Sequence, residues 1–136
     1  MRESNSVRLK ITSVALSAQD IEARLGLKPD ESWKIGERMG AFGSVSKEHG
    51  YALDSTASHA ASVSDHARSL IKRVADVVQK IAEVSTQAKV EIVCVIRAKT
   101  PPSLAFDRDD LRWFAAMGAR LDIDLHLIAD RDQKLT

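Results

Sequence analysis

The chain has 136 residues, of which 44% are hydrophobic and 29% are charged, and its formal net charge is +1. This balance predicts one globular domain over residues 1–136 and excludes a disordered or fibrous chain. Basic residues do not cluster and no apolar run approaches the ~20 residues that span a bilayer, so we expect neither a nucleic-acid partner nor a membrane partner. A single cysteine fits a reducing compartment, and a cytoplasmic location is expected.

The first elements in the chain are predicted to be a strand and a short helix. A polar tail, residues 1–6, precedes residues 7–12, in which apolar and polar side chains alternate as they do in a half-buried strand. Ser17 and Asp20 have the spacing of a capping box, which begins a helix. Gly26 supplies the left-handed residue that ends it.

Residues 32–55 are rich in glycine and contain two short apolar segments, around Trp33 and around Tyr51. This pattern predicts two short strands joined by a flexible connection, with a turn at His49–Gly50. The glycines do not lie between a strand and a helix in the way that a phosphate-binding loop requires, so we expect no cofactor here.

The second half of the chain is predicted to be helix, strand, helix and strand. Apolar side chains recur at three- and four-residue steps up to Val84, which indicates a long amphipathic helix that begins at Ser62 or Ser64. Residues 90–96 form the most apolar strand, with Cys94 buried as a small hydrophobic residue. A third helix, with Leu111, Phe114 and Ala115 on its inner face, follows Asp107. The last strand, residues 121–127, alternates, and its leucine and isoleucine side chains are expected to face inward. Residues 130–136 are a polar tail.

The elements therefore follow the order β-α-β-β-α-β-α-β, and the first six match the ferredoxin-like β-α-β-β-α-β arrangement. We predict an α+β protein, a two-layer sandwich with a mostly antiparallel sheet and an added helix and strand. Helices are expected on one face of the sheet only, because a sheet buried on both sides has continuously apolar strands. The other face is open or covered by a partner.

Several short motifs resemble those of a bacterial family of small α+β domains of unknown function. Residues 25–36 fill the pattern Leu-Gly-Leu-x-Pro-x-x-x-Trp-x-x-Gly, and residues 121–124 fill a closing Leu-Asp-Ile-Asp. One departure is Tyr51, which stands where many members have tryptophan. The resemblance implies a compact bacterial protein with no assigned catalytic residues. It also implies an immunity-type binding role, because some relatives lie near toxin or antitoxin systems.

The last strand carries the most suggestive polar cluster, which consists of Asp122, Asp124 and His126. Alternate residues of a strand lie about 7 Å apart on one face, so these side chains are candidates for holding a metal ion. A single strand does not bring three donors to one ion without a ligand from elsewhere. We therefore expect no metal, and instead a solvated or partner-binding face, with ion pairs to Arg8 and Lys10 on the first strand.

The other binding candidates are two tryptophans and a glycine. Trp33 is expected to be buried beside the glycine-bearing loop that contains Gly36. A tryptophan in such a place can line the bottom of a pocket or anchor an interface. Trp113 is expected to be partly exposed at the margin of the third helix. His59 and His66 bracket a helix start and are expected on the surface.

Together these residues predict binding and not catalysis, because the sequence has no nucleotide fingerprint and no nucleophile elbow. The leading hypothesis is an interaction module that uses the open sheet face or the loop of residues 36–50. Its partner is an unidentified protein or a second copy of the chain. Val93 and Val95 are expected to give the open face an apolar centre with a charged rim. The alternative is a small metal-binding or hydrolytic domain that uses the polar cluster of the last strand, with His49 as a further candidate.

Overall fold

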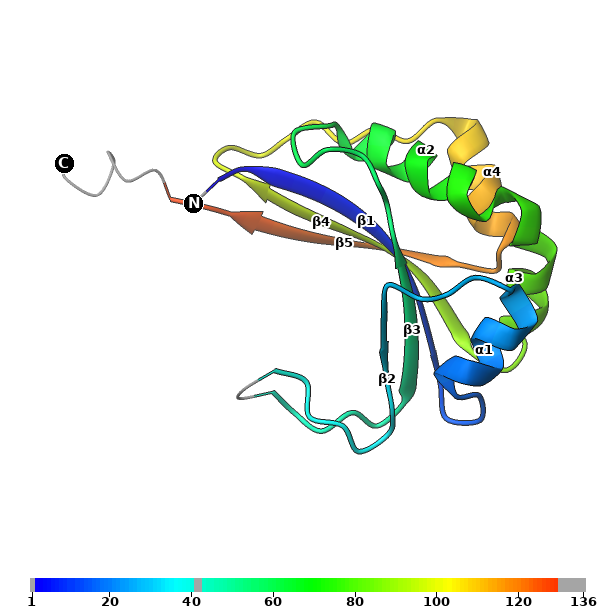
Figure 1. The fold of residues 1–136 in the computed structure, drawn as a ribbon. Helices are drawn as coiled ribbons and strands as arrows, with labels where there is room; N and C mark the ends of the chain where they lie inside the picture. Colours follow the sequence, from blue (N-terminus) through cyan, green and yellow to red (C-terminus); the bar gives the residue numbers. More distant parts are fainter. Residues whose placement is uncertain (1, 41–42, 130–136) are drawn as a thin grey trace.

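A computed structural model of the chain describes residues 2–40 and 43–129, and the expected tail at residues 130–136 lies outside the described residues. The protein is mixed α+β, as its sequence predicted (Figure 1). In chain order the elements are β1 (Ser4–Ser13), α1 (Ala18–Leu25), β2 (Glu31–Trp33), β3 (His49–Asp54), α2 (Val63–Val74), the 3₁₀ helix η1 (Ala75–Val77), α3 (Val78–Val84), β4 (Lys89–Ala98), α4 (Arg108–Ala116) and β5 (Arg120–Leu127).

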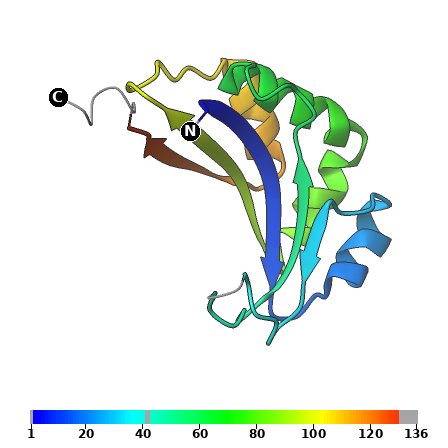
Figure 2. The same ribbon diagram turned by 60° about the vertical axis from the view of Figure 1, so that its left-hand side comes forward.

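The strands form one five-stranded sheet in the order β2-β3-β1-β4-β5. Neighbouring strands are antiparallel except for β4 and β5, which are parallel and are connected through α4. The helices lie together on one face of the sheet, and the sheet curls so that its other face is concave (Figure 1, Figure 2). The alternating strands therefore predicted correctly that helices cover only one face.

The core lies between the sheet and the helices and is aliphatic. Apolar residues of β1 and β4 at its centre, such as Leu9 and Ile92, are completely buried, and the predicted burial of Cys94 is confirmed. The predicted capping box between Ser17 and Asp20 is present at the start of α1. Gly26 ends α1 with a φ of 73°, a left-handed conformation that favours glycine.

Three boundaries differ from those predicted. β1 begins at Ser4, inside the expected tail, because residues 4–6 pair with the end of β4. The long helix does begin after Ser62, but η1 interrupts it and leaves α2 and α3 as separate segments. Gly50 lies within β3 and not in a turn, since it pairs with Trp33 of β2 and with Thr12 of β1.

The inner face of α4 differs in part from the prediction. Phe114 is buried as expected, but Leu111 and Ala115 are exposed, and Asp110 and Met117 are buried instead. The buried carboxylate Asp110 lies 4.0 Å from the Arg68 guanidinium of α2, so an interhelical ion pair takes part in packing α4. Amphipathic spacing could not reveal this, because it ranks a carboxylate below leucine as a core residue.

Candidate functional site

The concave face of the sheet carries the largest hollow among the described pockets, with a volume of about 670 Å³. Because Val7 and Leu9 of β1 point into the core, the alternating residues Arg8 and Lys10 point to the concave face. Arg8 lies opposite Val93 of β4, so this valine shares the same face. The hollow therefore lies over the concave face of the sheet, and past the end of β3 its lining extends to Ser55 and to His66 of α2.

Trp33 forms an apolar wall of this hollow. It lies opposite Gly50 in the pairing of β2 with β3, and its ring covers the glycine so closely that an added Cβ would be 1.9 Å from the ring atom Cε2. The Lys10 ammonium lies 6.0 Å from the centre of the same ring, which is cation–π distance. The expected burial of Trp33 is confirmed, with 8% exposure, but its neighbours are on the concave face and it is not part of the main core cluster.

Arg8 forms the charged part of the wall. Its Nε and Nη2 atoms donate to the two carboxylate oxygens of Asp54 at 2.7 and 3.1 Å, and its Nη1 donates to Glu31 Oε1 at 3.1 Å. The hydrogen bond with Asp54 is the largest cause of the raised pKa of Arg8. Lys10, in contrast, makes no ion pair within 4.0 Å among residues 2–40 and 43–129. Arg8 is thus fixed in place by two carboxylates, whereas the Lys10 ammonium lies at cation–π distance from the Trp33 ring.

The connection between β2 and β3 contributes Met39 to the lining of the hollow. Gly36, one of the predicted binding residues, has a φ of 90° and donates its N–H to the Ser46 carbonyl at 2.8 Å. An isolated bridge between Arg38 and Val45 joins the two limbs of the connection. Gly36 therefore shapes the connection but does not itself line the hollow.

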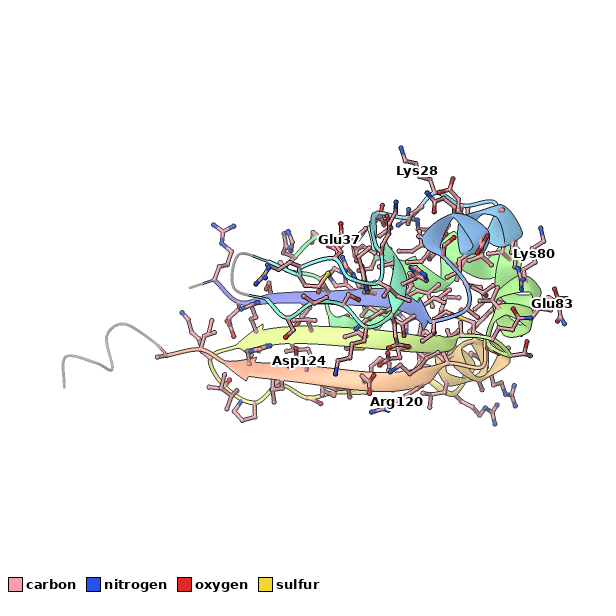
Figure 3. The ribbon with its side chains drawn as sticks, turned by 90° about the horizontal axis from the view of Figure 1, so that it is seen from below. Lys28, Glu37, Lys80, Glu83, Arg120 and Asp124 are labelled. Atoms are coloured by element: carbon pink, nitrogen blue, oxygen red, sulfur yellow. The ribbon has the colours of Figure 1, made fainter. Side chains whose placement is uncertain are left out.

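The predicted polar cluster of β5 lies on the concave face, next to the hollow and not in its lining. Asp122 and Asp124 lie opposite Val93 and Val95 of β4 in the sheet register. Figure 3 shows Asp124 and Arg120 along one margin of the sheet. The valines predicted for the centre of this face are thus in the hollow, and the carboxylates lie one strand farther out.

The cluster is divided into two separate pairs of side chains. Asp122 accepts from Arg120 at 2.8 Å, and Asp124 lies 3.0 Å from His126. The expected ion pairs of the aspartates with β1 are absent among the described residues, because β4 lies between β1 and β5. In the described part of the chain, no three histidine, cysteine, aspartate or glutamate side chains lie where they could hold a metal ion.

Glu91 is a concave-face residue that the sequence did not single out. It lies opposite Lys10 of β1 and is only 9% exposed. A hydrogen bond with Asp122, together with burial, raises the pKa of Glu91, and the same hydrogen bond lowers the pKa of Asp122. As the pH falls, Glu91 is therefore protonated before Asp122.

The prediction for His66 was wrong, because this side chain is 2% exposed, whereas His59 is exposed as expected. His66 Nδ1 lies 2.7 Å from Ser55 Oγ, and His66 Nε2 lies 2.8 Å from the Ser58 carbonyl oxygen. A serine bonded to a histidine can serve as a nucleophile. Here Ser55 Oγ also accepts the Val7 N–H, so the pair ties the segment after β3 to α2 and β1.

Trp113 is 38% exposed on α4, which agrees with the predicted partial exposure. The helix that carries it belongs to the layer on the opposite face of the sheet (Figure 1). The structure therefore brings one predicted binding residue, Trp33, into the hollow with Arg8, Lys10 and Val93, and it separates Trp113 from them.

These features define a class of protein: an α+β domain with helices on one side of a curled sheet and an open, partly apolar hollow on the other. Within residues 2–40 and 43–129, none of the helices has the length and apolar character needed to cross a membrane.

Residues 2–127 match a domain of unknown function (DUF4279), and the chain belongs to this family. The predicted membership of a family of unknown function is thereby confirmed. No match was found among curated proteins or among solved structures.

Proposed function

We propose that this chain is a binding protein and not an enzyme, and that it holds a partner protein in the hollow of its concave sheet face. The observation that carries the proposal is the set of side chains that meet there. Trp33, Val93 and Val95 supply an apolar centre, and Arg8 and Lys10 supply charge beside it. Tryptophan and arginine are the residue types that most often dominate binding energy at protein interfaces.

The chemistry of the hollow suggests what its partner presents. A concave surface is complementary to a convex one. We therefore expect the partner to present a turn or a helix that inserts an apolar side chain beside Trp33. Lys10 has no ion pair among the described residues. We therefore expect the partner to carry a carboxylate beside its inserted apolar side chain, where it would form an ion pair with Lys10. The Arg8 guanidinium already donates hydrogen bonds to Asp54 and Glu31, so its side chain lines the hollow in a fixed position before a partner binds.

Self-association through this face has less support. A symmetric dimer places the same patch against itself, so one hollow would face another and the two would pack poorly. An immunity-type role, in which the partner is a toxin, remains the specific form of the proposal that the family resemblance suggests. We also propose a cytoplasmic location, which the one buried, unpaired cysteine supports.

We further infer that the fold is a ferredoxin-like arrangement extended by α4 and β5. The order β2-β3-β1-β4, with antiparallel neighbours, supports this inference. The motif at residues 25–36 is consistent with a structural role in positioning Trp33. Gly26 ends α1, and the Leu27 carbonyl accepts a hydrogen bond from the Tyr51 hydroxyl of β3. Trp33 then follows on β2.

The alternative, a metal-binding or hydrolytic domain at the β5 cluster, has weaker support. Asp124 and His126 do approach each other, but Asp122 turns to Arg120 and Glu91. Two donors on one strand leave an ion with too few protein ligands.

Capture experiments with three tagged proteins test the proposal: wild type, Val95→Lys and Val14→Lys. Val95 lies in the hollow, whereas Val14 is 68% exposed outside it, so Val14→Lys is a matched control for the same chemical change. Each protein is incubated with extract from cells in which the chain occurs naturally, and captured proteins are quantified by mass spectrometry. We expect one partner that wild type and Val14→Lys retain and that Val95→Lys loses by at least about tenfold. Equal capture by all three, with folding verified by circular dichroism, would refute the proposal.

A further inference from the structure

The free edge of the sheet at β5 has features of an interaction surface separate from the hollow. β5 is the last strand in the sheet order, and among the described residues it pairs only with β4. Its eight residues include no proline and no lysine, two residue types that commonly protect edge strands. The opposite edge, β2, is only three residues long and is thus protected by its shortness.

An exposed apolar row runs along β5. Ile123, Leu125 and Leu127 are 45, 42 and 58% exposed, although alternation predicted them to be inward. They do share the face that packs against helices, because their partners on β4 are buried. Those partners are Cys94, Ile96 and Ala98. β5 extends past the helix layer, however, so no helix covers this part of it (Figure 1). An apolar row beside unpaired backbone groups is an unusual surface for an isolated domain.

We propose that β5 pairs antiparallel with β5 of a second copy of the chain, in a register centred on Leu125. A two-fold axis at this residue puts Leu125 opposite itself and Ile123 opposite Leu127 of the second copy. On the concave side it puts Asp124 opposite His126 of the second copy, twice. Within residues 123–127 each cross-strand pair on this axis thus joins two apolar side chains or a carboxylate and an imidazole, which are favourable pairs in antiparallel sheets.

Neighbouring registers with the axis closer to the start of β5 lack this complementarity. An axis at Asp124 places this carboxylate opposite its own copy, and an axis at Ile123 places Asp122 opposite Asp124. Directly opposed like charges destabilise a strand pair. If one strand shifts by a single residue, its apolar side chains lie opposite the polar side chains of the other strand. Each face of the joined sheet would then carry apolar side chains from one of the two copies. The self-complementary charges and side chains of β5 are therefore the reason for choosing a second copy as the occupant.

The β5 pairing goes beyond the proposed function and does not depend on it. It uses the edge of β5, with the apolar row on the helix side and Asp124 and His126 on the concave side, and none of these residues lines the hollow. Val95→Lys is therefore expected to remain dimeric, and loss of the dimer is not expected to abolish partner capture.

Sedimentation equilibrium of the purified chain tests the dimer. We expect wild type to be dimeric at tens to hundreds of micromolar, Leu125→Lys to be monomeric, and Val14→Lys to match wild type. Leu125 and Val14 are both exposed, so neither variant should lose the fold, and thermal unfolding verifies this. A wild type that is monomeric throughout, or a Leu125→Lys protein that is as dimeric as wild type, would overturn the proposal.

Disulfide trapping tests the register. Two Leu125→Cys chains place their cysteines on the axis, where opposed Cα atoms of an antiparallel pair lie about 4.5–5.5 Å apart, within disulfide range. In the same register two Ile123→Cys residues are offset by four positions, roughly 13 Å along the strand. Under oxidised glutathione we expect covalent dimers for Leu125→Cys and none for Ile123→Cys. The buried Cys94 stays unreactive in both proteins. Equal trapping of the two variants, or trapping of Ile123→Cys alone, contradicts the register.

Discussion

Replacing Gly50 with alanine should displace Trp33 and open the wall of the hollow. An added Cβ would lie 1.9, 2.1 and 2.4 Å from three atoms of the indole ring, where ordinary contact begins at 3.4 Å. The ring must therefore retreat by roughly 1.5 Å to restore normal packing. Because Trp33 borders an open hollow, it can move outward without disturbing the main core.

Two opposing contributions set the change in the free energy of unfolding. Overpacking of this kind costs about 1–3 kcal/mol. Alanine in a strand interior is more favourable than glycine by about 0.5–1 kcal/mol, which offsets part of this cost. The expected net loss of stability is therefore about 1–2 kcal/mol.

Urea unfolding and tryptophan fluorescence measure the two consequences. In a Trp113→Phe background Trp33 is the only tryptophan, and its emission should move to longer wavelength in Gly50→Ala as the ring gains contact with water. In a Trp33→Ala background the same substitution should no longer destabilise, which makes a double-mutant cycle the control. Unchanged emission together with unchanged stability would show that Trp33 does not rest on Gly50.

Two further predictions follow from shifted pKa values. Burial raises the pKa of Cys94 to about 11, so in native protein at pH 8 this thiol should react with a disulfide reagent far more slowly than in urea-unfolded protein; equal rates would contradict its burial. The hydrogen bond from Arg73 lowers the pKa of Asp30, so this carboxylate stabilises the fold at neutral pH and the contribution is lost as the pH falls from about 4 through the lowered value. Asp30→Asn should therefore be less stable than wild type at pH 7, with the difference shrinking toward pH 2 in thermal unfolding; a difference independent of pH would argue against the ion pair.

Local patterns in the sequence predicted much of the fold. The capping box at Ser17, the glycine that ends α1 and the strand alternation depend on neighbouring residues alone, and the structure contains all three. Alternation also placed Val93 and Val95 correctly on the open face, because side-chain direction in a strand follows from position.

Features that depend on distant residues could not be predicted in this way. The contact between Trp33 and Gly50 depends on the register of β2 with β3, which no single segment encodes. The burial of His66 depends on hydrogen bonds with the segment after β3. Leu125 is exposed because β5 extends past the helix layer, so alternation gave the correct face of this strand but not the burial of its side chains (Figure 1).

The most direct test of the binding proposal is photo-crosslinking from Val95 in living cells. A photoreactive amino acid at this position would point into the hollow, and the same residue at Val14 serves as the control outside it. We predict a covalent adduct with a different protein from position 95 and none from position 14. No adduct from position 95, an adduct only with a second copy of the chain, or the same adducts from both positions would contradict the account.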